Sequence, residues 1–160
     1  MSTGNGKIKK MMIILSKATI ENVYAAFVLA NGARMEGIEA EMFCTFFGLE
    51  AIHKKKLNNL HVATVGNPAM HIPTMVGGLP GMEAFATHMM KKEMDKIDMP
   101  GVEEFLDILV ASGVKIWACK LAMDMFHYEK KDLIDGVEAV ITVGDFYHRS
   151  EGEGVHMLFI

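Results

Sequence analysis

The run Lys10-Met11-Met12-Ile13-Ile14-Leu15 is followed at once by Ser16 and Lys17. A continuous apolar run of this length is typical of a strand that is buried on both faces of a parallel sheet. Apolar residues then recur at helical spacing, at Val23, Ala26, Phe27, Ala30 and Ala33. A second strand is predicted over residues 39–45, which completes a β-α-β unit. The beginning of the chain therefore predicts an α/β fold with parallel strands.

The same alternation continues along the chain. Helices are predicted over residues 82–95, 100–111 and 120–126, a short helix over 47–56, and strands over 114–118, 138–143 and 155–160, with an extended piece over 60–65. Residues 66–81 are rich in proline and glycine, and a long irregular stretch inside a domain is more often functional than idle. We predict a disordered start over 1–6 and one domain over 7–160, a three-layer sandwich around a mostly parallel sheet of about five strands.

Composition excludes several classes of function. The chain has 160 residues, of which 51% are hydrophobic, enough for one domain with a sizeable core. Its net charge of −4 provides no basic field for nucleic acid. No apolar run approaches the roughly 18 residues of a transmembrane helix, so we expect no stable membrane insertion. No GxGxxG, P-loop or GxSxG motif follows a strand, so we expect no organic cofactor.

The two cysteines indicate where the protein works. Cys44 and Cys119 form no CxxC pair, and no apolar signal stretch is present at the N-terminus. Paired structural disulfides belong to oxidising compartments, whereas isolated thiols are typical of a reducing one. We therefore expect a cytoplasmic protein.

Cys119 is the strongest candidate for chemistry. It lies where the predicted strand over 114–118 passes into the predicted helix over 120–126. Unpaired N–H groups and the partial positive charge at a helix N-terminus favour the thiolate, and Lys120 adds a neighbouring cation. The thiolate is the nucleophilic form of cysteine. The alternative is a small buried hydrophobe that ends a strand, which is a common position for free cysteine.

Other candidates follow from the geometry of parallel sheets, whose ligands gather at the carboxyl ends of the strands. Ser16 and Lys17 follow the first strand, and the segment Cys44-Thr45-Phe46-Phe47-Gly48 lies at the end of the second. Ser16, Lys17 and Cys44 are candidates to line the same site. Cys44 is flanked by bulky apolar residues, so we expect burial to raise its pKa and slow its reactions.

Residues after Cys119, and one distant histidine, complete the predicted lining. Asp124 is a candidate to orient the turn, or alternatively a solvated helix residue. Met123 and His88 are candidates to line a pocket beside Cys119. The seven histidines are scattered without an HxH or HxxxH pair, so no metal site is expected. A soft metal such as copper(I) at that pocket stays open as an alternative.

Several stretches together resemble a known family. They are residues 25–33, 42–49, 77–84, 113–125 and 131–137. In these stretches the chain resembles the DsrE/DsrF-like sulfur-relay family, in particular its stand-alone DsrE-type proteins. The resemblance implies a flavodoxin-like fold, assembly into homo-oligomers, and a cysteine that carries sulfur as a persulfide. That cysteine lies in the family's ACxxxMD segment, which is Cys119 here. Relatives often have an aromatic residue at the position of Cys44, so no catalytic role is carried over to it.

The resemblance implies an intracellular sulfurtransferase. Sulfane sulfur would be held on Cys119, taken from a donor protein and passed to an acceptor protein, both with reactive thiols, by a trimer or a multiple of one. The irregular stretch over 66–81 would cover the persulfide. Two alternatives remain at this point: a non-catalytic scaffold subunit of a sulfur-metabolism complex, and a soft-metal-binding protein.

Overall fold

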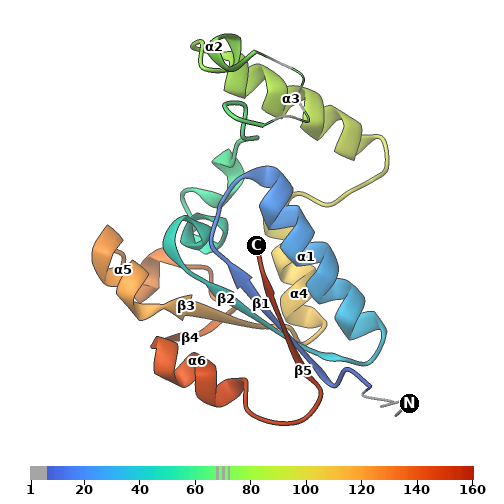
Figure 1. Ribbon diagram of the computed structural model, residues 1–160, viewed down its shortest axis with the longest axis vertical. Helices are drawn as coiled ribbons and strands as arrows, with labels where there is room; N and C mark the ends of the chain where they lie inside the picture. The colour runs from blue at the N-terminus through green and yellow to red at the C-terminus, as the bar shows by residue number, and fades with distance from the viewer. Residues whose placement is uncertain (1–6, 68, 70, 72) are drawn as a thin grey trace, which may run out of the picture.

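A computed structural model describes residues 7–67, 69, 71 and 73–160. The disordered start predicted over 1–6 lies outside these residues. Within them the chain forms one sheet of five parallel strands, in the order β4-β3-β2-β1-β5 (Figure 1). The strands are β1 (Lys10–Leu15), β2 (Glu39–Cys44), β3 (Lys115–Cys119), β4 (Val137–Ile141) and β5 (Val155–Phe159). The predicted α/β fold is confirmed, and the sheet is parallel throughout rather than mostly parallel.

Helices connect the strands. The α-helices are α1 (Ile20–Met35), α2 (Thr74–Gly77), α3 (Met82–Asp95), α4 (Val102–Ala111), α5 (Lys120–Phe126) and α6 (Val143–Arg149). Short 3₁₀ helices are η1 (Phe46–Ile52), η2 (Leu57–Asn59) and η4 (Lys130–Asp132). The bounds of β1, α3 and α5 coincide with the predicted ones, because each has an uninterrupted apolar run or helical period in the sequence.

The sheet is covered on both faces. α1 and α4 pack side by side on one face, where α1 contacts β1 and β2 (Figure 1). α6 lies on the other face, and its Phe146 stacks on Phe43 of β2 with ring centroids 4.7 Å apart. The core between α1 and the sheet includes Phe27, Ile13 and Met42, all fully buried. Burial on both faces explains why the central strands read as continuous apolar runs.

α2 and α3 extend away from the sheet, at the top of Figure 1. α3 buries only Ala86 and Thr87, and the Thr87 hydroxyl oxygen accepts a hydrogen bond of 3.0 Å from the backbone N–H of Val62. The structure gives part of the irregular stretch over 66–81 a helix, α2, which the sequence did not predict. Residues 60–65, predicted as an extended piece, form no strand and do not join the sheet.

α6 is the main departure from the predicted elements. The fourth sequence-predicted strand extended to residue 143, but β4 ends at Ile141 and a helix begins at Val143. Thr142 and Asp145 form a reciprocal capping box, in which each side chain accepts a hydrogen bond from the other's backbone N–H. This Thr-x-x-Asp spacing is a helix-start signal. In the sequence this signal is masked by the apolar run that precedes Thr142.

No helix among the described residues has both the length and the apolar character needed to cross a membrane.

Candidate functional site

Cys119 is the last residue of β3 and the N-cap of α5. Its backbone is extended, with φ −72° and ψ 119°, so the chain turns into the helix directly after it. The thiol is free and only 3% exposed. The predicted position of Cys119 between strand and helix is therefore correct, and the thiol lies beneath a cover rather than in open solvent.

The face on which Cys119 lies follows from the strand register. Side chains alternate along a strand, so Cys119 shares a face with Trp117. Trp117 pairs with Phe43 on β2, and the guanidinium of Arg149 on α6 lies 3.6 Å from the centre of the Trp117 ring. Cys119 therefore points to the face that α6 covers.

Cys44 lies beside Cys119 in the sheet but points the opposite way. It ends β2 and pairs with Ala118, so its side chain is on the face covered by α1 and α4. It is fully buried, and burial raises the pKa of the Cys44 thiol to about 12. The predicted upward shift of the Cys44 pKa is confirmed in direction. The sheet therefore separates the two thiols, although their strands are neighbours.

The residues that follow Cys119 have different environments. Met123 is 3% exposed and packs beneath α5. Lys120 and Asp124 are exposed and form an ion pair of 3.1 Å between Nζ and Oδ2, one helical turn apart. The positive charge of Lys120 is thus directed to Asp124. Asp124 is a solvated helix residue with a partner, which was the alternative interpretation of its sequence position.

An aromatic series joins α5 to η1. The rings of Phe47 and Phe126 are 5.5 Å apart, those of Phe126 and Tyr128 5.6 Å, and those of Tyr128 and His53 4.7 Å. Neighbouring rings at such distances contribute beyond their buried area. The series fixes the position of α5, and hence of the turn after Cys119, relative to the end of β2.

Phe46 begins η1 in a backbone conformation that bulky residues rarely adopt. Its φ is 45°, and its side chain is 49% exposed. Leu121 and Met125 on α5 and Val143 on α6 are also exposed apolar residues at this edge of the sheet. The surroundings of Cys119 therefore present apolar side chains to solvent.

A buried carboxylate ties α6 to the sheet. Glu41 of β2 is 3% exposed. It accepts a hydrogen bond of 2.7 Å from the Trp117 indole N–H and pairs with the ammonium of Lys10 at 2.8 Å. Arg149 approaches the same carboxylate at 3.7 Å, and its carbonyl accepts a hydrogen bond from Lys10. Removing either cation would leave a buried charge incompletely paired, which is costly.

Sequence reasoning missed this group. A glutamate between Ala40 and Met42 in an apolar strand was a usable signal, because buried charges are rarely found without partners. Its partners come from elements distant in sequence, and one of them lies in the overlooked helix α6. The spacing of residues in the sequence therefore does not reveal which side chains pair with Glu41.

The remaining predicted lining residues lie elsewhere. The Ser16 hydroxyl donates to the carbonyl of Ile160 at 2.9 Å, so Ser16 joins the ends of β1 and β5. Lys17 lines a separate cavity of about 290 Å³ together with His61. His88 is exposed on α3, which lies apart from α5 in Figure 1. Ser16 therefore lies at the junction of β1 and β5, Lys17 at that cavity and His88 on the exposed side of α3.

No three side chains of His, Cys, Asp or Glu among the described residues are grouped closely enough to hold a metal ion.

Two sequence relatives are similar over most of their length. The sulfur carrier protein DsrE2 of Allochromatium vinosum is 37% identical over 153 residues, which cover 91% of this chain and 95% of that protein. The uncharacterized protein YrkE of Bacillus subtilis is 26% identical over 135 residues, covering 81% and 84%.

Two solved structures share the fold. The YchN protein of E. coli has a TM-score of 0.58 at 17% identity, over 95% of this chain and 99% of that one. MTH1491 of Methanobacterium thermoautotrophicum, a protein of unknown function, has a TM-score of 0.57 at 12% identity, over 94% and 98%. At these identities the likeness concerns the arrangement of strands and helices.

The family model for DsrE/DsrF/DrsH-like proteins matches residues 7–158. The match covers the strands from β1 to β4, both cysteines, α6 and all but the last residue of β5. Together with the 37% identity to DsrE2, it confirms the family that the sequence motifs predicted. The chain belongs to the DsrE/DsrF/DrsH-like family.

Proposed function

We propose that this protein is a sulfur-relay protein that carries sulfane sulfur as a persulfide on Cys119 and passes it to the thiol of an acceptor protein. The observation that carries the proposal is a free thiol at the carboxyl end of β3 in a chain 37% identical to a sulfur carrier protein. Cys44 is a poor alternative, because burial raises its pKa to about 12 and keeps the thiol protonated.

The chemistry needs two exchanges and no external oxidant. The Cys119 thiolate attacks the outer sulfur of a donor persulfide, the donor's S–S bond breaks, and the donor leaves as a thiolate. Cys119 then holds the outer sulfur as a persulfide. An acceptor thiolate attacks that sulfur, the new S–S bond breaks, and Cys119 leaves as a thiolate. Oxidation states balance, because each step replaces one S–S bond by another.

The cover over Cys119 has a role in this proposal. A thiol that is 3% exposed is shielded from stray thiols, but a partner must displace the cover to reach it. The exposed apolar side chains of Phe46, Leu121 and Val143 at the same edge give a partner a surface to bind. The exchange takes place in a reducing cytoplasm, where free thiols persist.

Intact-mass spectrometry after a short incubation with polysulfide tests the proposal. The wild type should gain about 32 mass units per sulfur atom, and the gain should disappear on reduction. Cys119→Ala should abolish the gain, whereas the matched Cys44→Ala variant should retain it. Equal loading of the Cys119→Ala protein would remove Cys119 from the mechanism, and loading lost only in Cys44→Ala would identify the other cysteine.

The mass measurement separates a carrier from a scaffold, and elemental analysis separates it from a soft-metal protein. A scaffold protein would gain no sulfur at Cys119 after incubation with polysulfide. A metal-binding protein would contain copper after purification without added metal, which elemental analysis measures.

The proposal includes assembly into a homo-oligomer, a trimer or a multiple of one. Met157 and Phe159 on the edge strand β5 and Tyr147 on α6 expose apolar side chains, Phe159 to 72%. Contiguous exposed apolar surface is typical of protein interfaces. Light scattering that shows only monomer at micromolar concentration would contradict this part of the proposal.

A further inference from the structure

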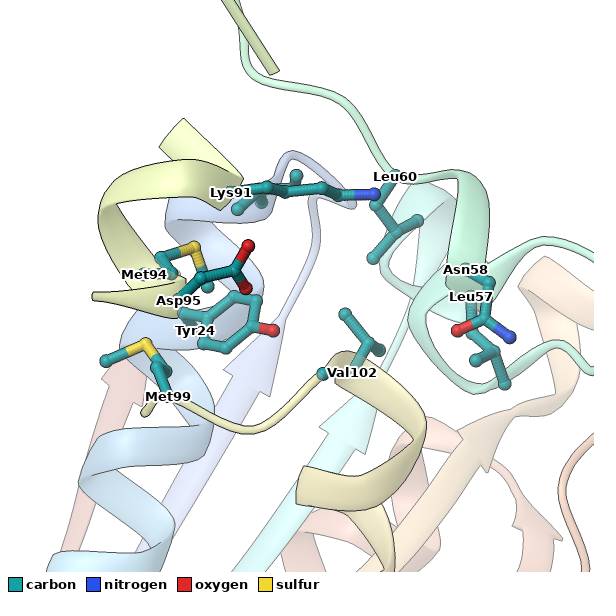
Figure 2. Close-up of a pocket in the computed structure, with 11 residues that line it drawn as sticks. Tyr24, Leu57, Asn58, Leu60, Lys91, Met94, Asp95, Met99 and Val102 are labelled. Carbon is teal, nitrogen blue, oxygen red and sulfur yellow. The ribbon is translucent and has the colours of Figure 1, made fainter. Parts of the chain in front are cut away.

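A pocket lies between the last turn of α3 and the first turns of α1 and α4, on the α1 side of the sheet (Figure 2). Its volume is about 230 Å³, and the ~30 Å³ that one water occupies in the liquid sets the scale. The space suits a molecule of amino-acid size and is smaller than the ~300–1,000 Å³ of pockets for drug-sized ligands.

Apolar side chains from four elements form its wall. Ile20 comes from α1, Leu57 from η2, and Val102 from the start of α4, while Leu60 follows η2. Met94 and Met99, on α3 and the connection after it, line the side opposite Leu57 in Figure 2. Methionine side chains adapt to the shape of an apolar ligand.

Tyr24 lines the pocket and contacts the elements around it. Its hydroxyl donates a hydrogen bond of 2.8 Å to the carbonyl of Pro100, which fixes the connection between α3 and α4. Its ring packs edge-on against Phe105 of α4, with centroids 6.0 Å apart. Burial raises the pKa of Tyr24, and the nearby charge of Asp95 raises it further. The carboxylate of Asp95 is therefore close enough to act on groups inside the pocket.

Two side chains of opposite charge, Lys91 and Asp95, line the mouth of the pocket and form no ion pair with each other among the described residues. They are one turn apart on α3, and in the described part of the chain no ion pair links either of them to another side chain. On the same helix Glu93 does pair with Lys96, at 2.6 Å. In Figure 2 the amino group of Lys91 reaches toward Leu60, whereas the carboxylate of Asp95 lies over Tyr24. Lysine preceding an acidic residue is also the less favourable order for a helical pair.

We propose that this pocket binds a free α-amino acid with an apolar side chain. The ligand carboxylate pairs with the Lys91 ammonium, the ligand ammonium pairs with the Asp95 carboxylate, and the apolar side chain lies against Ile20, Leu57, Leu60 and Val102. A zwitterion satisfies both mouth charges at once, whereas a simple anion or cation would face one like charge. The pocket opens beside α3, away from Cys119, so this inference is independent of the proposed function.

Isothermal titration calorimetry with L-leucine tests the proposal. Isocaproate, which lacks the amine, and isoamylamine, which lacks the carboxylate, should each bind about tenfold more weakly than leucine, since a charge-assisted contact is lost. Glycine, which lacks the apolar side chain, should also bind more weakly. No saturable binding of leucine, or isocaproate binding as tightly as leucine, would overturn the proposal.

Variants at the mouth assign each charge to its partner group. Lys91→Met should weaken leucine binding about tenfold but should not weaken isoamylamine, which has no carboxylate to pair with Lys91 and is repelled by its charge. Asp95→Asn should weaken leucine binding similarly but should not weaken isocaproate, which has no ammonium to pair with Asp95 and is repelled by its charge. Lys92→Met is the matched control, because Lys92 is the adjacent exposed lysine on α3 and does not line the pocket. Equal leucine affinity in all three variants would overturn the assignment.

Discussion

The ends of β2 and β3 are neighbours in the sheet, and each carries a cysteine as its last residue. The chain after Cys44 enters the 3₁₀ helix η1. Cys44 is fully buried on the face of the sheet that α1 and α4 cover, and burial raises the pKa of its thiol to about 12. The chain after Cys119 enters α5, and Cys119 points to the face of the sheet on which α6 packs. A one-residue offset in register is enough to send the two thiols to opposite faces. Position at the carboxyl edge of a parallel sheet therefore does not by itself make a thiol available.

Alkylation with iodoacetamide at neutral pH gives the largest expected difference between the two ends. A rise of the Cys44 pKa from 9.0 to about 12 lowers its thiolate fraction roughly a thousandfold. The native protein should therefore be labelled first at Cys119, and Cys119→Ser should lose that first phase. Peptide mapping after a time course measures this. Labelling of Cys44 as fast as Cys119 in the native protein would contradict this expectation. As a control, both thiols should react at the same rate in the urea-unfolded protein.

Lys10→Met tests the attachment of α6 over the Cys119 face. The substitution leaves the buried carboxylate of Glu41 without its partner at 2.8 Å, and we expect a loss of about 3 kcal/mol in the free energy of unfolding. A loosened α6 should also speed labelling of Cys119 and leave Cys44 slow. Urea unfolding and peptide mapping give the two readouts.

Lys9→Met serves as the control for that variant, because Lys9 is an exposed lysine next to Lys10. It should change the free energy of unfolding by less than about 0.5 kcal/mol, as is usual for surface positions. Equal losses in both variants would mean that the Glu41 group contributes little.

Gly48→Ala tests how η1 closes the end of β2. A Cβ at Gly48 would overlap the backbone carbonyl oxygen of Leu15, which cannot move without disturbing β1. We expect a loss of about 2 kcal/mol, typical of overpacking. Gly32→Ala in α1 is the contrast, because a Cβ there meets no atom within 4 Å. It should stabilise the protein by about 0.5–1 kcal/mol. Thermal unfolding of both variants distinguishes the two outcomes.

Alkaline titration of stability tests the raised pKa of Cys44 through a second measurement. The folded state resists deprotonation of Cys44, so this group's contribution is fully present below the ordinary thiol pKa near 9.0 and is lost as pH rises toward about 12. Over that window the wild type should lose up to about 1.4 kcal/mol per pH unit more than Cys44→Ala. Urea unfolding at several alkaline pH values measures the difference. If the free energies of unfolding of the wild type and Cys44→Ala fall in parallel with pH, Cys44 does not cause the alkaline loss of stability.

The sequence predicted the elements on which local pattern acts most strongly. The predicted bounds of β1 are correct because its apolar run is uninterrupted, and those of the helix after Cys119 are correct as well. The family followed from motifs spread along the chain. The start of α6 was present as Thr142-x-x-Asp145 but was hidden by the apolar run before it. The helix α2 had no apolar period to reveal it.

The environment of the two thiols was less accessible to sequence reasoning. The burial of Cys44 was predicted from its aromatic neighbours and is confirmed. A cover over Cys119 was predicted from the stretch over 66–81. The helix α6, whose Arg149 reaches Trp117 on the Cys119 face of the sheet, was not predicted. His88 was grouped with Cys119 on residue type alone, and α3 carries it elsewhere. Contacts between distant segments depend on topology, which spacing does not encode.

The pairing of β1 with both β2 and β5 has a consequence for folding kinetics. Lys10 pairs with Glu39 on one side and with Val155 on the other, so one partner is local and the other is far away in sequence. Closing the longer loop costs more entropy and is slower. Any intermediate with β1 and β2 paired but β5 still free presents the unpaired edge of an apolar strand, which is prone to aggregation. Slow refolding with a concentration-dependent yield is the expected signature of this strand order.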